Sequence, residues 1–157
     1  KMDSKGLQLV IRHNTPNTRQ VCKELLDVIL ESSDKAAPKA LALQRAVELL
    51  EGDVPNDKLI LSQQLGDSYK SQNLPHVQVR NKMRDRQPGS EPQSGDRVPF
   101  ILCKTWDPRA KAYEKAEDPK YAAEKKLDID YPYYFLNKFL IFEYFFTRIH
   151  MDMPYYI

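Results

Sequence analysis

Lys82–Ser90 reads Lys-Met-Arg-Asp-Arg-Gln-Pro-Gly-Ser, and Gly95–Leu102 reads Gly-Asp-Arg-Val-Pro-Phe-Ile-Leu. Together they predict a basic helix end, a Pro/Gly/Ser loop, a Gly-Asp-Arg turn and an apolar strand. From Arg80 to Arg97 there are five lysines and arginines against three acids, whereas the whole chain carries a net charge of +2. A local excess of positive charge is typical of a surface that binds a polyanion, although a charged helix face is more often only solvated.

The size and composition of the chain predict one folded domain with a core. It has 157 residues, of which 41% are apolar and 29% are charged. The most apolar stretch, 135–146, is interrupted by Lys138 and Glu143, so we expect no membrane span. Cys22 and Cys103 lie far apart in the sequence, which favours two reduced core thiols over a disulfide.

Two helices are predicted in the first third of the chain. Asn14-Thr15-Pro16 combines a capping side chain with a proline, and apolar residues then recur at helical spacing to Ser32. Pro38 opens a second helix, in which we expect Val47 and Leu50 to face inward, and Gly52 ends it.

The middle of the chain predicts short strands around another helix. Leu59–Leu61 predicts a strand or an extended link, and Ser62–Tyr69 a helical turn. Pro75 begins a helix that runs to about Arg86. Val98–Lys104 predicts a strand, which its Pro99 confines to an edge or a bulge, and the two strands could pair.

The last third predicts a turn and two more helices. Trp106–Arg109 should form the turn, Asp118-Pro119 should start a short helix, and Asp130 should cap a long helix over Tyr131–His150. The fold class that we expect is mainly α, a helical domain with a small β element.

The sequence contains no legible catalytic arrangement. Asp128 and Asp130 have the spacing of paired metal-binding carboxylates, but Asp130 is better explained as a helix cap. His13, His76 and His150 are isolated from one another and from the cysteines, which gives no zinc pattern. Glycine-rich phosphate-binding motifs are also absent, so we expect the isolated chain to be inactive as an enzyme and to bind no metal or cofactor.

Four blocks of the chain resemble the family B DNA polymerases, of the replicative delta type and their large-DNA-virus relatives. The first block is the pair of stretches quoted at the outset, because the family's thumb reads Met-Arg-x-Arg-x-Pro-Gly-Ser and then Gly-Asp-Arg-Val-Pro-Tyr. The others are Lys1–Leu7, which resembles the junction from palm to thumb, Lys115–Pro119, and Asp128–Tyr134, which resembles the start of the last thumb helix. The blocks fall in the family's order and spacing.

The resemblance implies a thumb domain over residues 1–157, with residues 1–13 as the palm-to-thumb junction and 139–157 as a divergent tail. It implies that the chain is a fragment of a larger DNA-directed DNA polymerase, a nucleotidyltransferase whose magnesium is held by palm carboxylates outside this chain. The family's usual Val-Arg-Arg-Asp-Asn-x-Pro is Val10–Pro16 here, with Ile11 and His13 replacing a basic and an acidic residue, so that Arg12 alone carries over.

Candidate DNA-binding residues follow from the family match and from helix geometry. Arg80 and Arg84 lie four residues apart, as do Lys82 and Arg86, and the two pairs lie on opposite faces of a helix. One pair could face phosphates and the other solvent or an acidic neighbour. The predicted DNA-binding residues, with Gly95 and Asp96 shaping the turn, are Lys5, Arg12, Lys82, Arg84, Arg86, Gly95, Asp96 and Arg97.

The implied partners are a primer-template duplex, the palm of the same polymerase and a sliding clamp, in the nucleus or, for a viral parent, in the host cell. An alternative reading is a helical protein-interaction module that docks through its aromatic C-terminal helix. That reading depends on the aromatic residues Tyr131, Tyr133, Tyr134, Phe135, Phe139, Phe142, Phe145 and Phe146. Salt-dependent duplex binding would distinguish the two.

Overall fold

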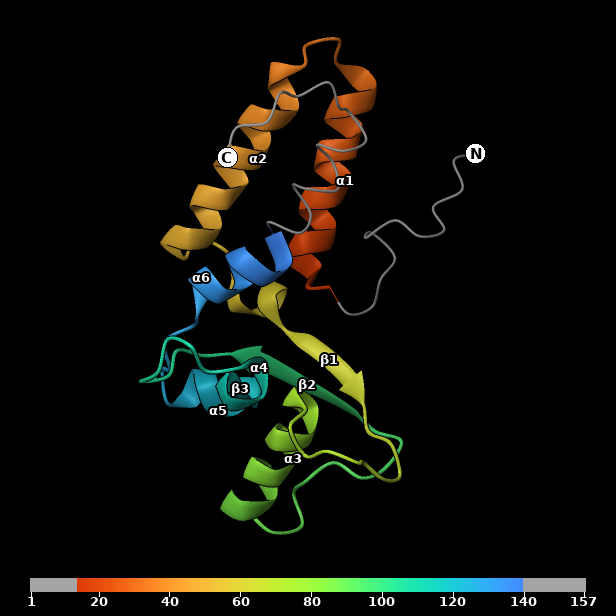
Figure 1. Ribbon diagram of the computed structural model, residues 1–157, viewed down its shortest axis with the longest axis vertical. Coiled ribbons are helices and arrows are strands. Elements are labelled where there is room, and N and C mark those ends of the chain that lie inside the picture. Colours follow the sequence, from red (N-terminus) through yellow and green to blue (C-terminus); the bar gives the residue numbers. More distant parts are fainter. Residues whose placement is uncertain (1–13, 140–157) are drawn as a thin grey trace. The chain divides into compact units, whose positions relative to one another are not determined.

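The computed structural model describes residues 14–139, which contain helices and one small antiparallel sheet (Figure 1). The predicted fold class, mainly α with a small β element, is confirmed. The elements are α1 (Pro16–Glu31), α2 (Ala36–Glu51), the 3-10 helix η1 (Asn56–Leu59), β1 (Leu61–Gln64), α3 (Pro75–Arg86), β2 (Arg97–Leu102), α4 (Ala112–Lys115), β3 (Ala116–Glu117), α5 (Pro119–Glu124), α6 (Tyr131–Tyr134) and the π-helical η2 (Phe135–Phe139).

The chain divides into two compact units. One contains Lys1–Pro55 and Tyr131–Ile157, and the other contains Asn56–Asp130. Whether they act as a single thumb domain over 1–157, as predicted, stays a prediction. Within residues 14–139, no helix is long and apolar enough to cross a bilayer.

In the first unit, α1 and α2 form a helical hairpin. Thr15 caps α1 as predicted, because its Oγ1 accepts a hydrogen bond of 3.1 Å from Thr18 N and Pro16 follows it. Arg45 of α2 ties the two helices together, donating from Nε to Glu24 Oε2 at 2.7 Å and forming an ion pair with Glu48. The apolar interior of the hairpin is formed by five buried side chains: Val21, Cys22, Leu25, Ala46 and Leu49.

Helix α2 differs from the prediction at its start and on its buried face. It begins at Ala36, and Pro38 lies within its first turn, where the missing N–H costs no helical hydrogen bond. Its predicted end is confirmed, since Gly52 has a φ of +81°. Val47 and Leu50, expected inward, are 43% and 44% exposed.

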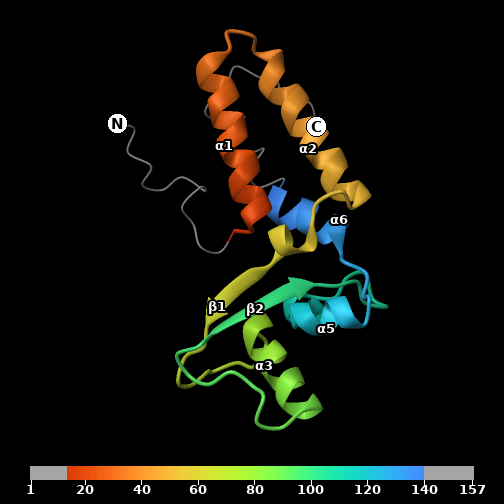
Figure 2. The ribbon, with the colours of Figure 1, turned by 180° about the vertical axis from the view of Figure 1, so that it is seen from behind.

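The predicted long C-terminal helix is replaced within the described residues by two shorter segments. Helix α6 covers Tyr131–Tyr134, and the chain then continues as the π-helical Phe135–Phe139. Tyr134 is buried, and both segments pack on α2 (Figure 2). The rest of the predicted helix, 140–150, lies outside the described residues.

In the second unit, the sheet has the strand order β1-β2-β3, and both pairs are antiparallel. Leu61 pairs with Phe100, and Ile101 pairs with Glu117. The predicted pairing of two distant strands is thus confirmed, and β3 adds a third. Pro99 is tolerated because β3 pairs with Ile101 and Leu102, beyond the proline, so that one side of β2 is an edge at this residue.

The helical turn predicted over Ser62–Tyr69 was wrong, and the strand predicted at Leu59–Leu61 lies further along the chain. Leu59 ends the 3-10 helix, and the strand is Leu61–Gln64, where a helical turn was expected. Leu61 and Leu65 are both buried, and a spacing of four fits one face of a strand as well as one face of a helix. Pairing with a strand more than thirty residues later decides between the two.

Candidate nucleic-acid interface

Helix α3 presents apolar side chains to the sheet and cations on its remaining surface. Pro75 occupies its first turn, as predicted, and Val77 and Val79 are fully buried where the helix packs on β2. Its last turn contains Arg84 and Arg86. Positive side chains are stabilised there by the partial negative charge of the helix C-terminus.

Lys82 and Arg86 face an acidic neighbour, Glu117 of β3. Lys82 Nζ lies 3.1 Å from Glu117 Oε1 and donates a hydrogen bond of 2.7 Å to Ala116 O. Arg86 Nη2 donates to the same Glu117 Oε1 at 2.9 Å. One carboxylate therefore binds two cations, and the three groups together carry one net positive charge.

Arg86 is positioned further by Tyr121 of α5, because its Cζ lies 3.3 Å from the centroid of the tyrosine ring. Burial would lower the pKa of Arg86, but its hydrogen bond to Glu117 and the surrounding negative charges outweigh this effect and raise the pKa. The arginine therefore stays charged. Sequence reasoning missed Glu117, because its role depends on β3 lying beside α3, for which the sequence has no local signal.

Arg80 and Arg84 have weaker partners on the helix itself. Arg80 donates to Asn81 Oδ1 at 3.1 Å, and Arg84 Nη2 lies 3.3 Å from Asp85 Oδ1. The side chains of Arg84 and Asp85 are 51% and 70% exposed, and an exposed ion pair of this kind contributes little to stability. The guanidinium of Arg84 is therefore accessible to an external anion.

The Gly-Asp-Arg turn before β2 has the predicted geometry. Gly95 has a φ of +91°, and Asp96 Oδ2 accepts a hydrogen bond of 2.8 Å from Gln93 N. Arg97 is exposed and donates from Nη2 to Ser62 O at 3.0 Å. Its side chain is therefore held by Ser62 of β1.

The structure places the candidate residues at two separate positions. Figures 1 and 2 show the loop that leaves the end of α3 and runs to the start of β2, so the helix end and the Gly95 turn lie at its opposite ends. Lys5 and Arg12 lie outside the described residues.

In the Asp128-x-Asp130 pair, Asp130 has a structural role. Asp130 Oδ2 lies 2.6 Å from Lys115 Nζ, and the Lys115 side chain is 1% exposed. The backbone beside it is extended, with Ile129 bridged to Cys103. Asp130 does precede α6, as expected of a cap, but its carboxylate is engaged by a buried ammonium. Among residues 14–139, no three His, Cys, Asp or Glu side chains form a group that could hold a metal ion.

His76 and the cysteines are core residues. His76 is 1% exposed, and its Nε2 lies 3.0 Å from Tyr69 Oη. Burial, with a smaller effect of Arg80, lowers the pKa of His76, which favours the neutral ring. Both cysteines are free thiols, as expected, and burial raises the pKa of Cys22 to about 12 and that of Cys103 to about 11.

Comparison with known proteins identifies the family. The family model described as DNA polymerase family B matches residues 1–142. The chain belongs to DNA polymerase family B. It is 36% identical over 134 residues to the DNA polymerase delta catalytic subunit of Candida albicans and 36% identical over 137 residues to the DNA polymerase of Paramecium bursaria Chlorella virus NY2A. Each alignment covers 85% of this chain, but 13% and 15% of the respective relative.

A solved structure shares the fold. The family B DNA polymerase from the hyperthermophilic archaeon Pyrobaculum calidifontis matches 92% of this chain and 19% of its own, with a TM-score of 0.71 and 18% sequence identity. This family B chain therefore corresponds to one part of much longer polymerases.

Proposed function

We propose that this chain is the thumb of a DNA-directed DNA polymerase and holds the primer-template duplex through its phosphate backbone. One observation carries the proposal: the C-terminal half of α3 leaves positive charge exposed. Of its cations Lys82, Arg84 and Arg86, Glu117 neutralises one, and the ion pair between Arg84 and Asp85 is open to water. A processive polymerase must hold any sequence, and phosphate contacts carry no base identity.

The contacts that we propose combine the exposed and the partly neutralised cations. Arg84 and Arg97 are exposed and can meet a phosphate directly. Lys82 and Arg86 would contribute the one positive charge that Glu117 does not neutralise. The full set of proposed phosphate contacts is Lys5, Arg12, Lys82, Arg84, Arg86 and Arg97, with Gly95 and Asp96 shaping the turn.

Duplex binding, measured by fluorescence anisotropy across a salt series, tests this proposal. Arg84→Ala and Arg97→Ala should each lower the slope of log affinity against log salt by roughly 0.9 and weaken all sequences alike. The matched control is Lys39→Ala, an exposed lysine of α2 with no assigned contact. If both variants behave as the control does, the basic stretch is only a solvated face.

The chemical step belongs to the parent enzyme. We propose that magnesium is bound by palm carboxylates outside this chain, because Asp130, the best-placed carboxylate here, is occupied by Lys115. The 157-residue chain should then show no incorporation with primer-template, deoxynucleotides and magnesium. Robust extension by a highly purified sample would contradict this.

The remaining partners follow from the same proposal: the palm of the parent and a sliding clamp. The parent would act in the nucleus, or in a host cell if it is viral. Absence of duplex binding together with self-association would favour the interaction module instead.

A further inference from the structure

The loop between β2 and α4 holds the single tryptophan of the chain, Trp106, fully in solvent. The residue is 96% exposed. The turn beneath it is nevertheless well hydrogen-bonded: Thr105 Oγ1 donates to Asp107 O at 2.8 Å, and Arg109 N donates to Asp107 Oδ1 at 2.9 Å. Ala110 anchors the loop, since it is buried and its N–H donates to Asp107 O at 3.1 Å. A defined turn therefore holds the indole away from the core.

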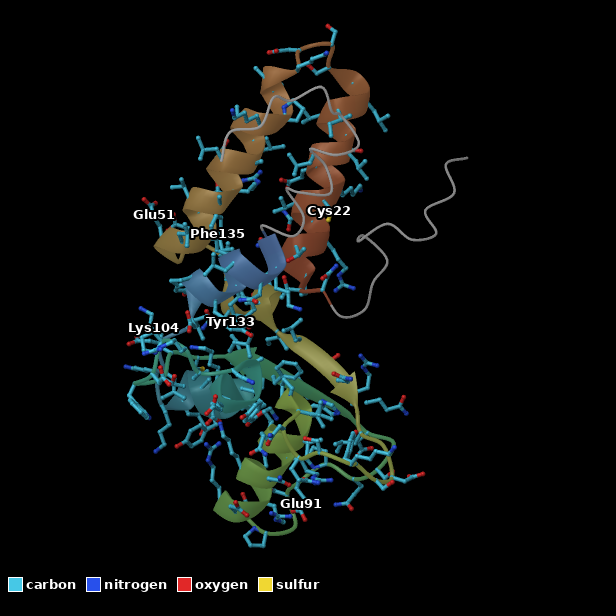
Figure 3. All side chains as sticks on the ribbon, viewed as in Figure 1. Cys22, Glu51, Glu91, Lys104, Tyr133 and Phe135 are labelled. Atoms are coloured by element: carbon cyan, nitrogen blue, oxygen red, sulfur yellow. The ribbon has the colours of Figure 1, made fainter. Side chains whose placement is uncertain are left out.

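Cations flank this tryptophan in the sequence of the loop. Lys104, Arg109 and Lys111 are exposed, against one acid in the loop, Asp107, whose carboxylate already accepts the Arg109 N–H. In the part of the chain that the structure describes, the side chains of Lys104 and Arg109 form no ion pair. Figure 3 shows Lys104 directed outward at the edge of its unit.

Exposing an indole to water is unfavourable, and a contact that covers it would recover that free energy. An aromatic ring flanked by cations matches a single-stranded nucleic acid, whose bases have free π faces and whose phosphates repeat along the strand. A duplex fits poorly, because its bases are already stacked. We propose that the Trp106 loop, residues 104–111, binds single-stranded nucleic acid, with the indole stacked on an unpaired base and Lys104 and Arg109 on phosphates.

This site is distinct from the proposed duplex contacts. The Gly95 turn precedes β2 and the Trp106 loop follows it, and a strand of this length spans about 20 Å. Loss of the loop's function would leave the contacts of Arg84 and Arg97 in place. The two proposals can therefore fail independently.

Tryptophan fluorescence tests the stacking directly, because emission from the 157-residue chain reports on Trp106 alone. Titration with a short oligothymidylate should quench this emission saturably and protect the indole from acrylamide. In anisotropy with a labelled oligothymidylate, Trp106→Ala should weaken binding about 5- to 140-fold. Trp106→Phe keeps a ring and should retain most of the affinity, whereas Lys104→Gln and Arg109→Gln should each lower the salt slope by roughly 0.7.

Three results would overturn the proposal. The first is oligothymidylate binding with unchanged emission, and the second is equal affinity of the alanine and phenylalanine variants. The third is an emission that changes with protein concentration but not with oligothymidylate, which would indicate a protein contact. Lys39→Ala serves as the charge control, and blunt duplex binding by Trp106→Ala should equal that of the parent chain. Because Trp106 is fully exposed, none of these variants removes a core contact.

Discussion

Replacing Glu117 with glutamine removes the negative charge that Lys82 and Arg86 share and keeps the shape of the side chain. The Glu117 side chain is 12% exposed, while those of Lys82 and Arg86 are 30% and 33% exposed. A hydrogen bond to a charged group contributes about 1.5–3 kcal/mol, but the two cations recover part of their hydration when released. We therefore expect the free energy of unfolding to fall by about 1–3 kcal/mol.

Urea denaturation measures this loss, and the midpoint should fall by roughly 0.5–1.5 M with an unchanged m-value. The matched control is Glu124→Gln, an exposed residue of α5 with the same change of charge, which should lie within about 0.5 kcal/mol of the parent. Glu117→Gln should also raise the salt slope of duplex binding, because Lys82 and Arg86 are released toward phosphates. If Glu117→Gln and Glu124→Gln unfold at the same urea concentration, Glu117 does not hold α3 to β3.

Three further predictions concern backbone and core. Gly52→Ala should lower the free energy of unfolding by about 1–3 kcal/mol, because the φ of Gly52 is +81° and a Cβ would lie 3.1 Å from the Tyr131 ring. Gly66→Ala, whose Cβ would have its nearest atom at 3.5 Å, should lower it less in the same urea assay. Asp130→Asn should lower the free energy of unfolding by about 3–5 kcal/mol, because it leaves Lys115 charged and buried. In the full-length parent the same variant should leave the single-turnover rate nearly unchanged. A thousandfold slower rate would reveal a metal site. The two cysteines, with pKa values raised to about 12 and about 11, should react with a thiol reagent only on unfolding, and rapid labelling of the folded protein would contradict their burial. Their neutral thiols should also stabilise the fold below about pH 9, and this stabilisation should be lost as the pH rises toward those pKa values.

The starts of α1, α3 and α5 could be predicted because their signals are local. Thr15 and Asp118 accept hydrogen bonds from backbone N–H groups three residues later, and Pro75 lies in the first turn of α3. Each signal acts within one turn, so a sequence window contains the whole interaction. The extent of strand β1 could not be predicted in this way, because residues 62–64 are compatible with either structure until they pair with residues 97–99.

The cations of the candidate site could be predicted from the sequence, but the partners that each cation contacts could not. Helical spacing separated Lys82 and Arg86 from Arg80 and Arg84, and the structure confirms that one pair faces an acidic neighbour. The identity of that neighbour depends on the β2–β3 pairing and cannot be read from charge patterns. The same holds for Lys115, whose buried ammonium is acceptable only because Asp130 lies 2.6 Å away.

Glu117 also determines how much of the positive charge of α3 can reach a polyanion. A phosphate that approaches Lys82 or Arg86 must compete with a carboxylate already 3.1 Å and 2.9 Å away, whereas at Arg84 it competes with an exposed Asp85 and water. The gain from the first two contacts is therefore reduced by the ion pairs that they disturb, and the gain at Arg84 is not. If the thumb assignment holds, Arg84→Ala should lower duplex affinity more than Lys82→Ala, while Lys82→Ala should lower stability more than Arg84→Ala. The opposite order in affinity would mean that Glu117 releases its cations when DNA binds, and the opposite order in stability would mean that Glu117 does not hold Lys82 in the free protein.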